Sequence, residues 1–93
     1  EECRREVEAL HARGIAAMVP LNCTIWETAW YMRSMEEMMV GMMTDDPLTE
    51  RHFERITVLA EQRAAAFASC GADLLHLGDD IGMQQTIMMS HEL

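Results

Sequence analysis

The sequence predicts an α/β fold that is a slice of a parallel-stranded barrel or of a larger sheet. Two short apolar runs, residues 15–21 and 73–78, have the length of β-strands, and a long stretch of helical pattern separates them. A crossover of that length permits only parallel pairing of the two strands, with the right-handed connection that β-α-β units adopt. Two strands alone leave both edges of the sheet open, so we expect a larger structure to complete the fold.

The first helix is predicted over residues 2–13, where apolar positions recur every three to four residues. Gly14 follows it and provides a residue that adopts the left-handed conformation of a helix C-cap without strain. The strand that comes next is continuously apolar, which indicates burial on both faces, as in parallel sheets. Pro20 is placed at the end of this strand, where its missing N–H group is least harmful.

Two capping boxes predict the next two helices. Thr24-Ile25-Trp26-Glu27 and Ser34-Met35-Glu36-Glu37 each place a hydroxyl three residues before a glutamate. We therefore expect helices over residues 24–33 and 35–44, with a bend at Ser34.

A third, longer crossover helix is predicted to begin after Asp46, with Pro47 in its first turn. Gly71 ends this helix. Its apolar stripe is predicted at Phe53, Ile56, Ala60, Ala64 and Phe67.

Composition excludes several classes of function. The 93 residues include 16 acidic and 7 basic side chains, all of the latter arginine, for a net charge of −9. Without lysine there is neither a Schiff-base lysine nor a phosphate-loop lysine. The acidic balance argues against nucleic acid and against an anionic membrane surface as partners.

The three cysteines are widely spaced and form no C-x-x-C pair, which indicates a reducing, cytoplasmic location. No apolar run is long enough to cross a membrane, and the start does not resemble a signal peptide. The chain begins at Glu1 rather than at methionine, so we expect residues 1–93 to be a fragment of a single larger domain.

Methionine and aromatic residues cluster in the crossover. The methionine spacing is typical of a helix face packed against a sheet, with a soft-metal site or a plastic binding groove as the alternative. The aromatic cluster follows the first strand, where it could line a pocket or pack as a structural wedge. The methionines are Met35, Met38, Met39, Met42 and Met43, and the aromatic residues are Trp26, Trp30 and Tyr31.

The carboxyl ends of the two strands are the expected place for chemistry, because parallel α/β folds put their sites there. Asp79 and Asp80 follow the second strand directly and could act as a general base, a metal ligand or a clamp for a polar substrate. An ordinary aspartate-glycine turn with Gly82 is the alternative. His76 is four residues before Asp80 and on the same strand face, so the two could look into one cleft; a hydrogen-bonded strand histidine is the alternative.

Several segments resemble the uroporphyrinogen decarboxylase family, within the superfamily that also holds corrinoid-linked methyltransferases. The most specific is Gly78-Asp79-Asp80-Ile81-Gly82-Met83-Gln84, preceded by Gly71-Ala72-Asp73 and followed by Met89-Ser90-His91-Glu92-Leu93. The segment from Trp26 to Glu36, with Asp46-Pro47, resembles the helix pair of the decarboxylase-like members. The resemblance implies a partial TIM (β/α)8 barrel slice with about two parallel strands and four helices, cut from a barrel of roughly 250 residues or more.

This resemblance implies a lyase of porphyrin biosynthesis that decarboxylates tetrapyrrole acetate groups, or a paralogous reaction, without a cofactor. A corrinoid-dependent methyltransferase, which would use zinc or a corrinoid, and a small acidic non-catalytic binding module are the alternatives. The family's other catalytic or zinc-binding residues lie outside residues 1–93, so we expect these residues alone to be inactive.

The resemblance also implies the roles of individual residues. Asp79 or Asp80 would be catalytic, and the substrate would be a small molecule. Gln84, Tyr31, Trp30, Trp26 and His76 would bind that substrate, no metal ligand is expected among these residues, and a homodimer of the full-length protein is an open alternative.

Overall fold

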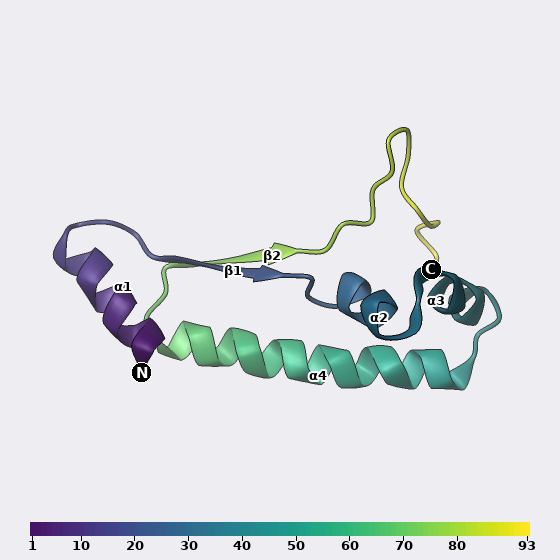
Figure 1. The fold of residues 1–93 in the computed structure, drawn as a ribbon, viewed down its shortest axis with the longest axis horizontal. Coiled ribbons are helices and arrows are strands. Elements are labelled where there is room, and N and C mark those ends of the chain that lie inside the picture. The colour runs from purple at the N-terminus through teal and green to yellow at the C-terminus, as the bar shows by residue number, and fades with distance from the viewer.

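The computed structural model describes residues 1–93 as a mixed α/β fold of four helices and a two-stranded parallel sheet (Figure 1). The predicted elements are all present, with ends that differ by a few residues, and the two strands form an open pair rather than a closed barrel. In chain order the elements are α1 (Glu2–Ala12), β1 (Met18–Asn22), α2 (Trp26–Arg33), α3 (Met35–Met43), α4 (Pro47–Ser69) and β2 (Leu74–Gly78).

The two strands pair in parallel along their whole length, from Met18 opposite Leu74 to Asn22 opposite Gly78. The long helix α4 runs back beneath the sheet (Figure 1). The carboxyl ends of both strands point toward α2. The sequence predicts Pro20 at the end of the first strand, but it lies in the middle of β1. Because a two-stranded sheet has only edge strands, the missing N–H group of Pro20 is tolerated there.

Of the five predicted end signals in the helices, three are confirmed and a fourth forms in part. Gly14 and Gly71 have φ values of +73° and +90°, the left-handed conformation that favours glycine. The Asp46 side chain accepts a hydrogen bond from the Leu48 N–H group, with Pro47 in the first turn of α4. At Ser34 only half of the predicted box forms, because Ser34 Oγ accepts from the Glu37 N–H group while the Glu37 carboxylate lies 3.7 Å from the Arg33 guanidinium.

The core lies among helices α2, α3 and α4. Its fully or nearly buried members are Trp26, Ala29, Met38 and Ile56. The methionine face of α3 packs against two helices, so the prediction that it packs against a sheet is wrong. Met43 is 74% exposed, so the last position of the predicted stripe is wrong.

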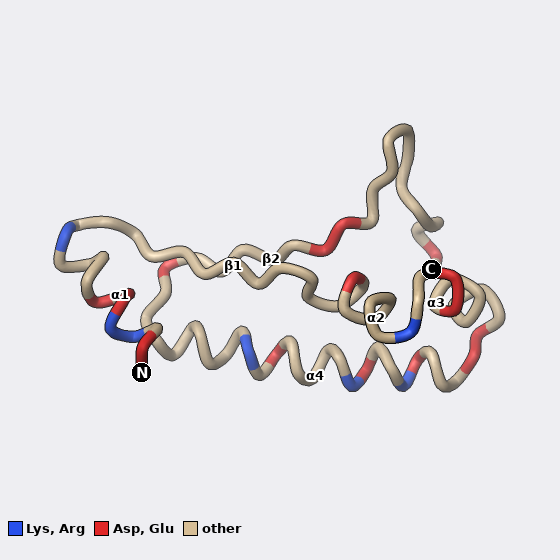
Figure 2. Tube along the Cα trace, in the orientation of Figure 1, with Lys and Arg blue, Asp and Glu red and all other residues tan.

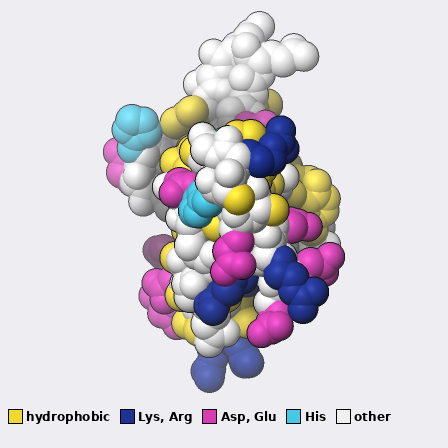
Figure 3. Space-filling model, turned by 90° about the vertical axis from the view of Figure 1, so that its left-hand side faces the viewer, with side chains coloured by type: hydrophobic (Ala, Val, Ile, Leu, Met, Phe, Trp, Pro, Cys, Tyr) yellow, Lys and Arg dark blue, Asp and Glu magenta, His cyan; other side chains and the backbone are white.

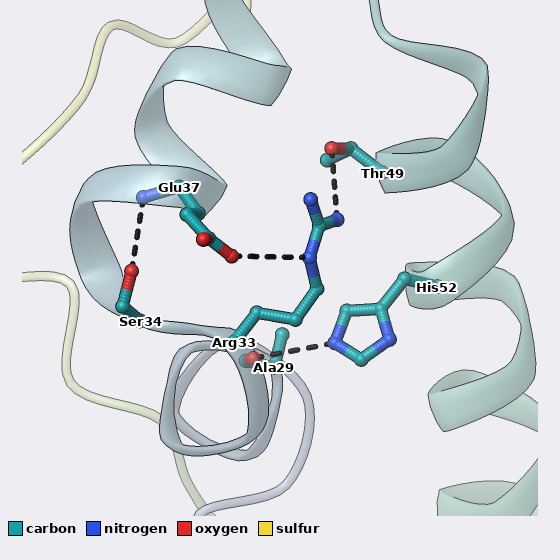
Figure 4. Close-up of polar contacts among 6 residues, drawn as sticks. All are labelled: Ala29, Arg33, Ser34, Glu37, Thr49 and His52. Atoms are coloured by element: carbon teal, nitrogen blue, oxygen red, sulfur yellow. Dashed lines mark hydrogen bonds and ion pairs between the residues drawn. The ribbon is translucent and has the colours of Figure 1, made fainter.

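A polar junction ties the same three helices together (Figure 4). The Arg33 guanidinium, at the end of α2, donates to Thr49 Oγ1 of α4 at 3.2 Å and lies beside Glu37 of α3. His52 Nε2 is 3.2 Å from the Ala29 carbonyl oxygen. Two helices that the chain joins through a sharp bend are thus held against the first turns of α4.

The amino end of the sheet is closed by α1. Arg4 donates to the Ser69 carbonyl oxygen at 3.2 Å, and Val7 is buried beside Gly71. Asp73, just before β2, accepts from the Ala17 N–H group at 2.8 Å and lies 2.7 Å from His11 Nε2. These bonds join the α1–β1 segment to the start of β2.

The hydrogen bonds of Asp73 to Ala17 and His11 predict that the stability of the fold depends on pH. The bond to the Ala17 N–H group, with a second contribution from His11, lowers the pKa of the Asp73 carboxyl below its ordinary value of 3.8. The charged form therefore adds stability at neutral pH, and this contribution is lost as the pH falls below about 5 and through the lowered pKa. We expect Asp73→Asn to flatten the acid limb of a plot of unfolding free energy against pH.

The exposed Asp45, which accepts no side-chain hydrogen bond, supplies the matched control. Asp45→Asn should leave the acid limb of that plot as it is in the unchanged chain. If Asp73→Asn leaves the acid limb unaltered, the charged Asp73 carboxylate does not stabilise the fold as described.

The sheet is covered on one side only. The prediction of strands buried on both faces is therefore wrong for these residues, since Met18 and Leu74, paired on the face opposite α4, are 54% and 57% exposed. No helix is both long enough and apolar enough to cross a membrane.

Residues 1–93 expose more surface than a self-contained protein of their mass. The accessible area is 6934 Å², whereas a folded monomer of 10.6 kDa exposes about 5,500 Å². The radius of gyration is 16.6 Å, against about 12 Å for a compact domain of this length. The space-filling view from the α1 end shows hydrophobic side chains interspersed with charges of both signs (Figure 3).

Candidate functional site

The candidate site lies at the carboxyl ends of the two strands, where an acidic segment follows β2 (Figure 2). Asp79 Oδ2 accepts hydrogen bonds from the Ile25 and Trp26 N–H groups at 2.8 and 2.9 Å. Asp79 Oδ1 accepts a third from the Glu27 N–H group at 2.9 Å. These donors are unpaired groups at the start of α2, so Asp79 caps a helix that begins more than fifty residues earlier in the chain.

Glu27 completes the connection from the opposite side. Its Oε1 atom accepts from the Asp80 N–H group at 2.6 Å, and its Oε2 atom accepts from the Cys23 thiol at 3.0 Å. Asp79 and Glu27 thus each accept from the backbone of the other's segment, and we refer to this pair as the strand-end clamp. It fixes the backbone of Asp80 relative to α2.

The capping box predicted at Thr24 is wrong. The helix begins at Trp26 with Ile25 as its N-cap residue, and no side chain of that segment caps it. The Thr24 hydroxyl instead donates to the carbonyl oxygens of Leu21 and Gly78. Asp79 takes over the role of the Thr24 side chain, because a carboxylate with two oxygens can accept from three donors at once.

The Cys23 thiol is part of the same cluster. Its hydrogen bond to Glu27, followed by partial burial and by the charges of Glu27 and Asp79, raises the pKa of the thiol above its ordinary value of 9.0. A thiol needs a lowered pKa to act as a nucleophile at neutral pH. Cys23 is therefore a hydrogen-bond donor within the clamp rather than a reactive thiolate.

Asp80 differs from Asp79 in its surroundings. Its side chain is exposed, and Oδ1 accepts from the Gly82 N–H group at 2.8 Å, the two-residue turn typical of aspartate. Its Oδ2 atom accepts no hydrogen bond from the protein. The turn interpretation and the ligand-binding interpretation are thus compatible, because one oxygen shapes the turn and the other is available.

His76 and Asn22 lie on the open face of the sheet. A β-carbon placed at Gly78 would be 3.2 Å from Asn22 Oδ1 and 4.0 Å from His76 Cε1, so these two polar side chains flank Gly78 on one face. His76 is exposed and makes no hydrogen bond to Asp80. Sequence reasoning missed Asn22, although the parallel register places the end of the first strand beside Gly78.

The predicted aromatic residues take different positions. The Trp26 indole is 5% exposed and stacks near Phe53 with ring centroids 6.4 Å apart, whereas Tyr31 is 65% exposed. Trp30 packs against Tyr31 at 4.2 Å. The buried N–H groups of Trp26 and Trp30 have no hydrogen-bond partner. Trp26 therefore contacts Asp79 through its backbone N–H group and not through its indole ring.

Gln84 lies in the exposed segment after β2, and its side chain makes no hydrogen bond. The structure thus brings Asp79, Asp80 and the start of α2 together, while Gln84, Tyr31 and His76 are solvent-facing and separate. No group of three histidine, cysteine, aspartate or glutamate side chains is arranged to hold a metal ion.

Comparisons of the chain with protein-family models, with curated proteins and with solved structures found no match.

Proposed function

We propose that residues 1–93 are part of an enzyme that resembles the uroporphyrinogen decarboxylase family and removes carboxyl groups from the acetate side chains of a tetrapyrrole. The observation that carries the proposal is the pair of aspartates after β2. One is fixed by three backbone donors, and its neighbour presents a free carboxylate oxygen at the end of a parallel sheet. Barrel enzymes place their substrate groups at this end of the strands.

The open sheet supports a partial barrel. Both strands have a free edge, and the face opposite α4 exposes the apolar side chains of Met18 and Leu74. The surface in excess of a compact monomer, roughly 1,400 Å², is what a slice of a larger barrel would bury against its neighbouring strands and helices. Further strands on either side of the pair would cover Met18 and Leu74.

The proposed chemistry gives the two aspartates different roles. In the decarboxylation, a proton adds to the pyrrole ring and forms a ring cation. The bond to the carboxyl carbon then breaks, its electron pair neutralises the ring, and CO₂ leaves. The exocyclic methylene carbon finally takes a proton and the ring loses the one it gained, so the acetate side chain becomes a methyl group. The carboxylate of Asp80 would stabilise the ring cation electrostatically. Asp79 is a positioning residue that holds the backbone of Asp80, and Gln84, His76, Trp30 and Tyr31 are proposed to contact the substrate.

The test is turnover of uroporphyrinogen by the complete protein that contains these residues. Asp80→Ala should lower kcat/KM by about 10²–10³-fold, the usual effect of losing one electrostatic stabiliser, with an unchanged unfolding transition. Asp45→Asn, a change at an exposed acid on the loop between α3 and α4, is the control and should keep full activity. Unchanged activity in Asp80→Ala, or loss of folding as its only effect, would contradict the proposal.

The same assay separates the other two interpretations. Transfer of a methyl group in place of CO₂ release would indicate the corrinoid-dependent methyltransferase. Residues 1–93 do not offer the three or four ligands that zinc needs, so those ligands would have to come from elsewhere in the protein. A stable, monomeric 93-residue species without either activity would indicate the binding module.

A further inference from the structure

We propose that the groove between α2 and α4 binds an acidic amphipathic helix of a partner protein. The groove has a volume of about 550 Å³ and lies on the helical layer, away from the strand-end clamp. The proposal does not rest on the decarboxylase activity. Its lining includes Thr28, Met32, His52, Arg55, Leu59 and Arg63.

The shape of the groove suits a helix. Along α4 the lining extends from His52 to Ala66, about 21 Å at the rise of an α-helix, and residues of α2 form the other wall. The exposed side chains of Met32 and Leu59, 69% and 60% accessible, stand at its apolar centre. A helix laid beside two helices would cover both of these side chains along successive turns.

The charge of the groove is opposite to that of the chain. Arg55 and Arg63 line it, no aspartate or glutamate does, and neither guanidinium forms an ion pair. Residues three and four positions away on the same helix, where a partner acid would be, are apolar or basic for both arginines. Two unpaired cations in a chain of net charge −9 therefore remain available to an external acid.

The two arginines also define a spacing. They are eight residues apart on α4, which corresponds to about 12 Å along the helix axis. A partner helix with carboxylates seven or eight residues apart, beside an apolar stripe, would meet both guanidinium groups while its stripe covers Leu59.

The test uses a synthetic acidic amphipathic peptide of about four helical turns, with leucines on one face and two glutamates eight residues apart. Fluorescence anisotropy of the labelled peptide would measure its affinity for the complete protein that contains these residues. Arg55→Gln with Arg63→Gln should weaken binding by about 2- to 30-fold, the combined effect of two solvent-exposed ion pairs, and salt should weaken it as well. Leu59→Asn should weaken binding by about 10-fold.

Arg51→Gln is the matched control, because Arg51 is on the same helix but outside the groove and has Glu54 three residues away. It should leave the affinity unchanged, and replacing the two peptide glutamates by glutamine should reproduce the effect of the double variant. No binding, or equal binding by the unchanged chain and the double variant, would overturn the proposal. Self-association that the double variant abolishes, without peptide binding, would overturn it in favour of a second copy.

Discussion

Met38→Ala is expected to destabilise the chain by about 2–5 kcal/mol, the usual effect of emptying a fully buried methionine site. The Met38 side chain is 0% exposed and packs in the cluster with Trp26, Ala29 and Ile56. Because three helices meet at this residue, they cannot close the cavity without moving apart from their other contacts. Urea unfolding followed by circular dichroism would measure the change.

Met43→Ala is the control for this prediction, since Met43 is on the same helix and 74% exposed. It removes the same atoms from a position in water, so we expect a change within about 0.5 kcal/mol. If Met38→Ala and Met43→Ala lower the free energy of unfolding equally, α3 does not pack as described.

The second large effect is expected at Gly41, where a general rule predicts the opposite sign. Replacing glycine by alanine inside a helix usually stabilises it by about 1 kcal/mol. Here a β-carbon at Gly41 would overlap Oγ1 of Thr49, a residue that is 2% exposed, and would lie 3.0 Å from its Cβ atom. We expect Gly41→Ala to destabilise the chain by about 1–3 kcal/mol, because α3 and α4 must separate.

A double-mutant cycle with Thr49→Ala tests this explanation. Thr49→Ala removes the overlapping hydroxyl, so the cost of Gly41→Ala should fall by roughly 1 kcal/mol in that background. Thr49→Ala alone loses the hydrogen bond from Arg33, and the cycle subtracts that cost. If Gly41→Ala stabilises the unchanged chain, the close contact of the two helices would be refuted.

Local signals predicted the helices well, whereas contacts between distant segments decided the site. Asp46, Pro47 and Gly71 act on their own neighbours, so their pattern could be interpreted without knowledge of the fold. Thr24 and Glu27 match a capping box equally well, yet Asp79 caps the helix because the parallel pairing brings the end of β2 to the start of α2. No sequence spacing near Thr24 indicates this partner.

The faces of the strands were the other point at which sequence reasoning fell short. A continuous apolar run cannot tell whether the covering elements belong to the same segment, and here only one face is covered. Met43 is exposed for a related reason, because helical spacing predicts which side chains share a stripe but not which of them a neighbouring helix covers.

The most direct test of the account is to compare Asp79→Ala and Asp80→Ala by urea unfolding. Asp79 accepts three backbone hydrogen bonds, so its loss should cost about 2–3 kcal/mol. Asp80 is exposed and accepts only one, so its loss should cost less than about 1 kcal/mol. This result would assign Asp79 to the fold and leave Asp80 free for a ligand. Equal losses, or a larger loss at Asp80, would contradict the division of roles on which the proposed site depends.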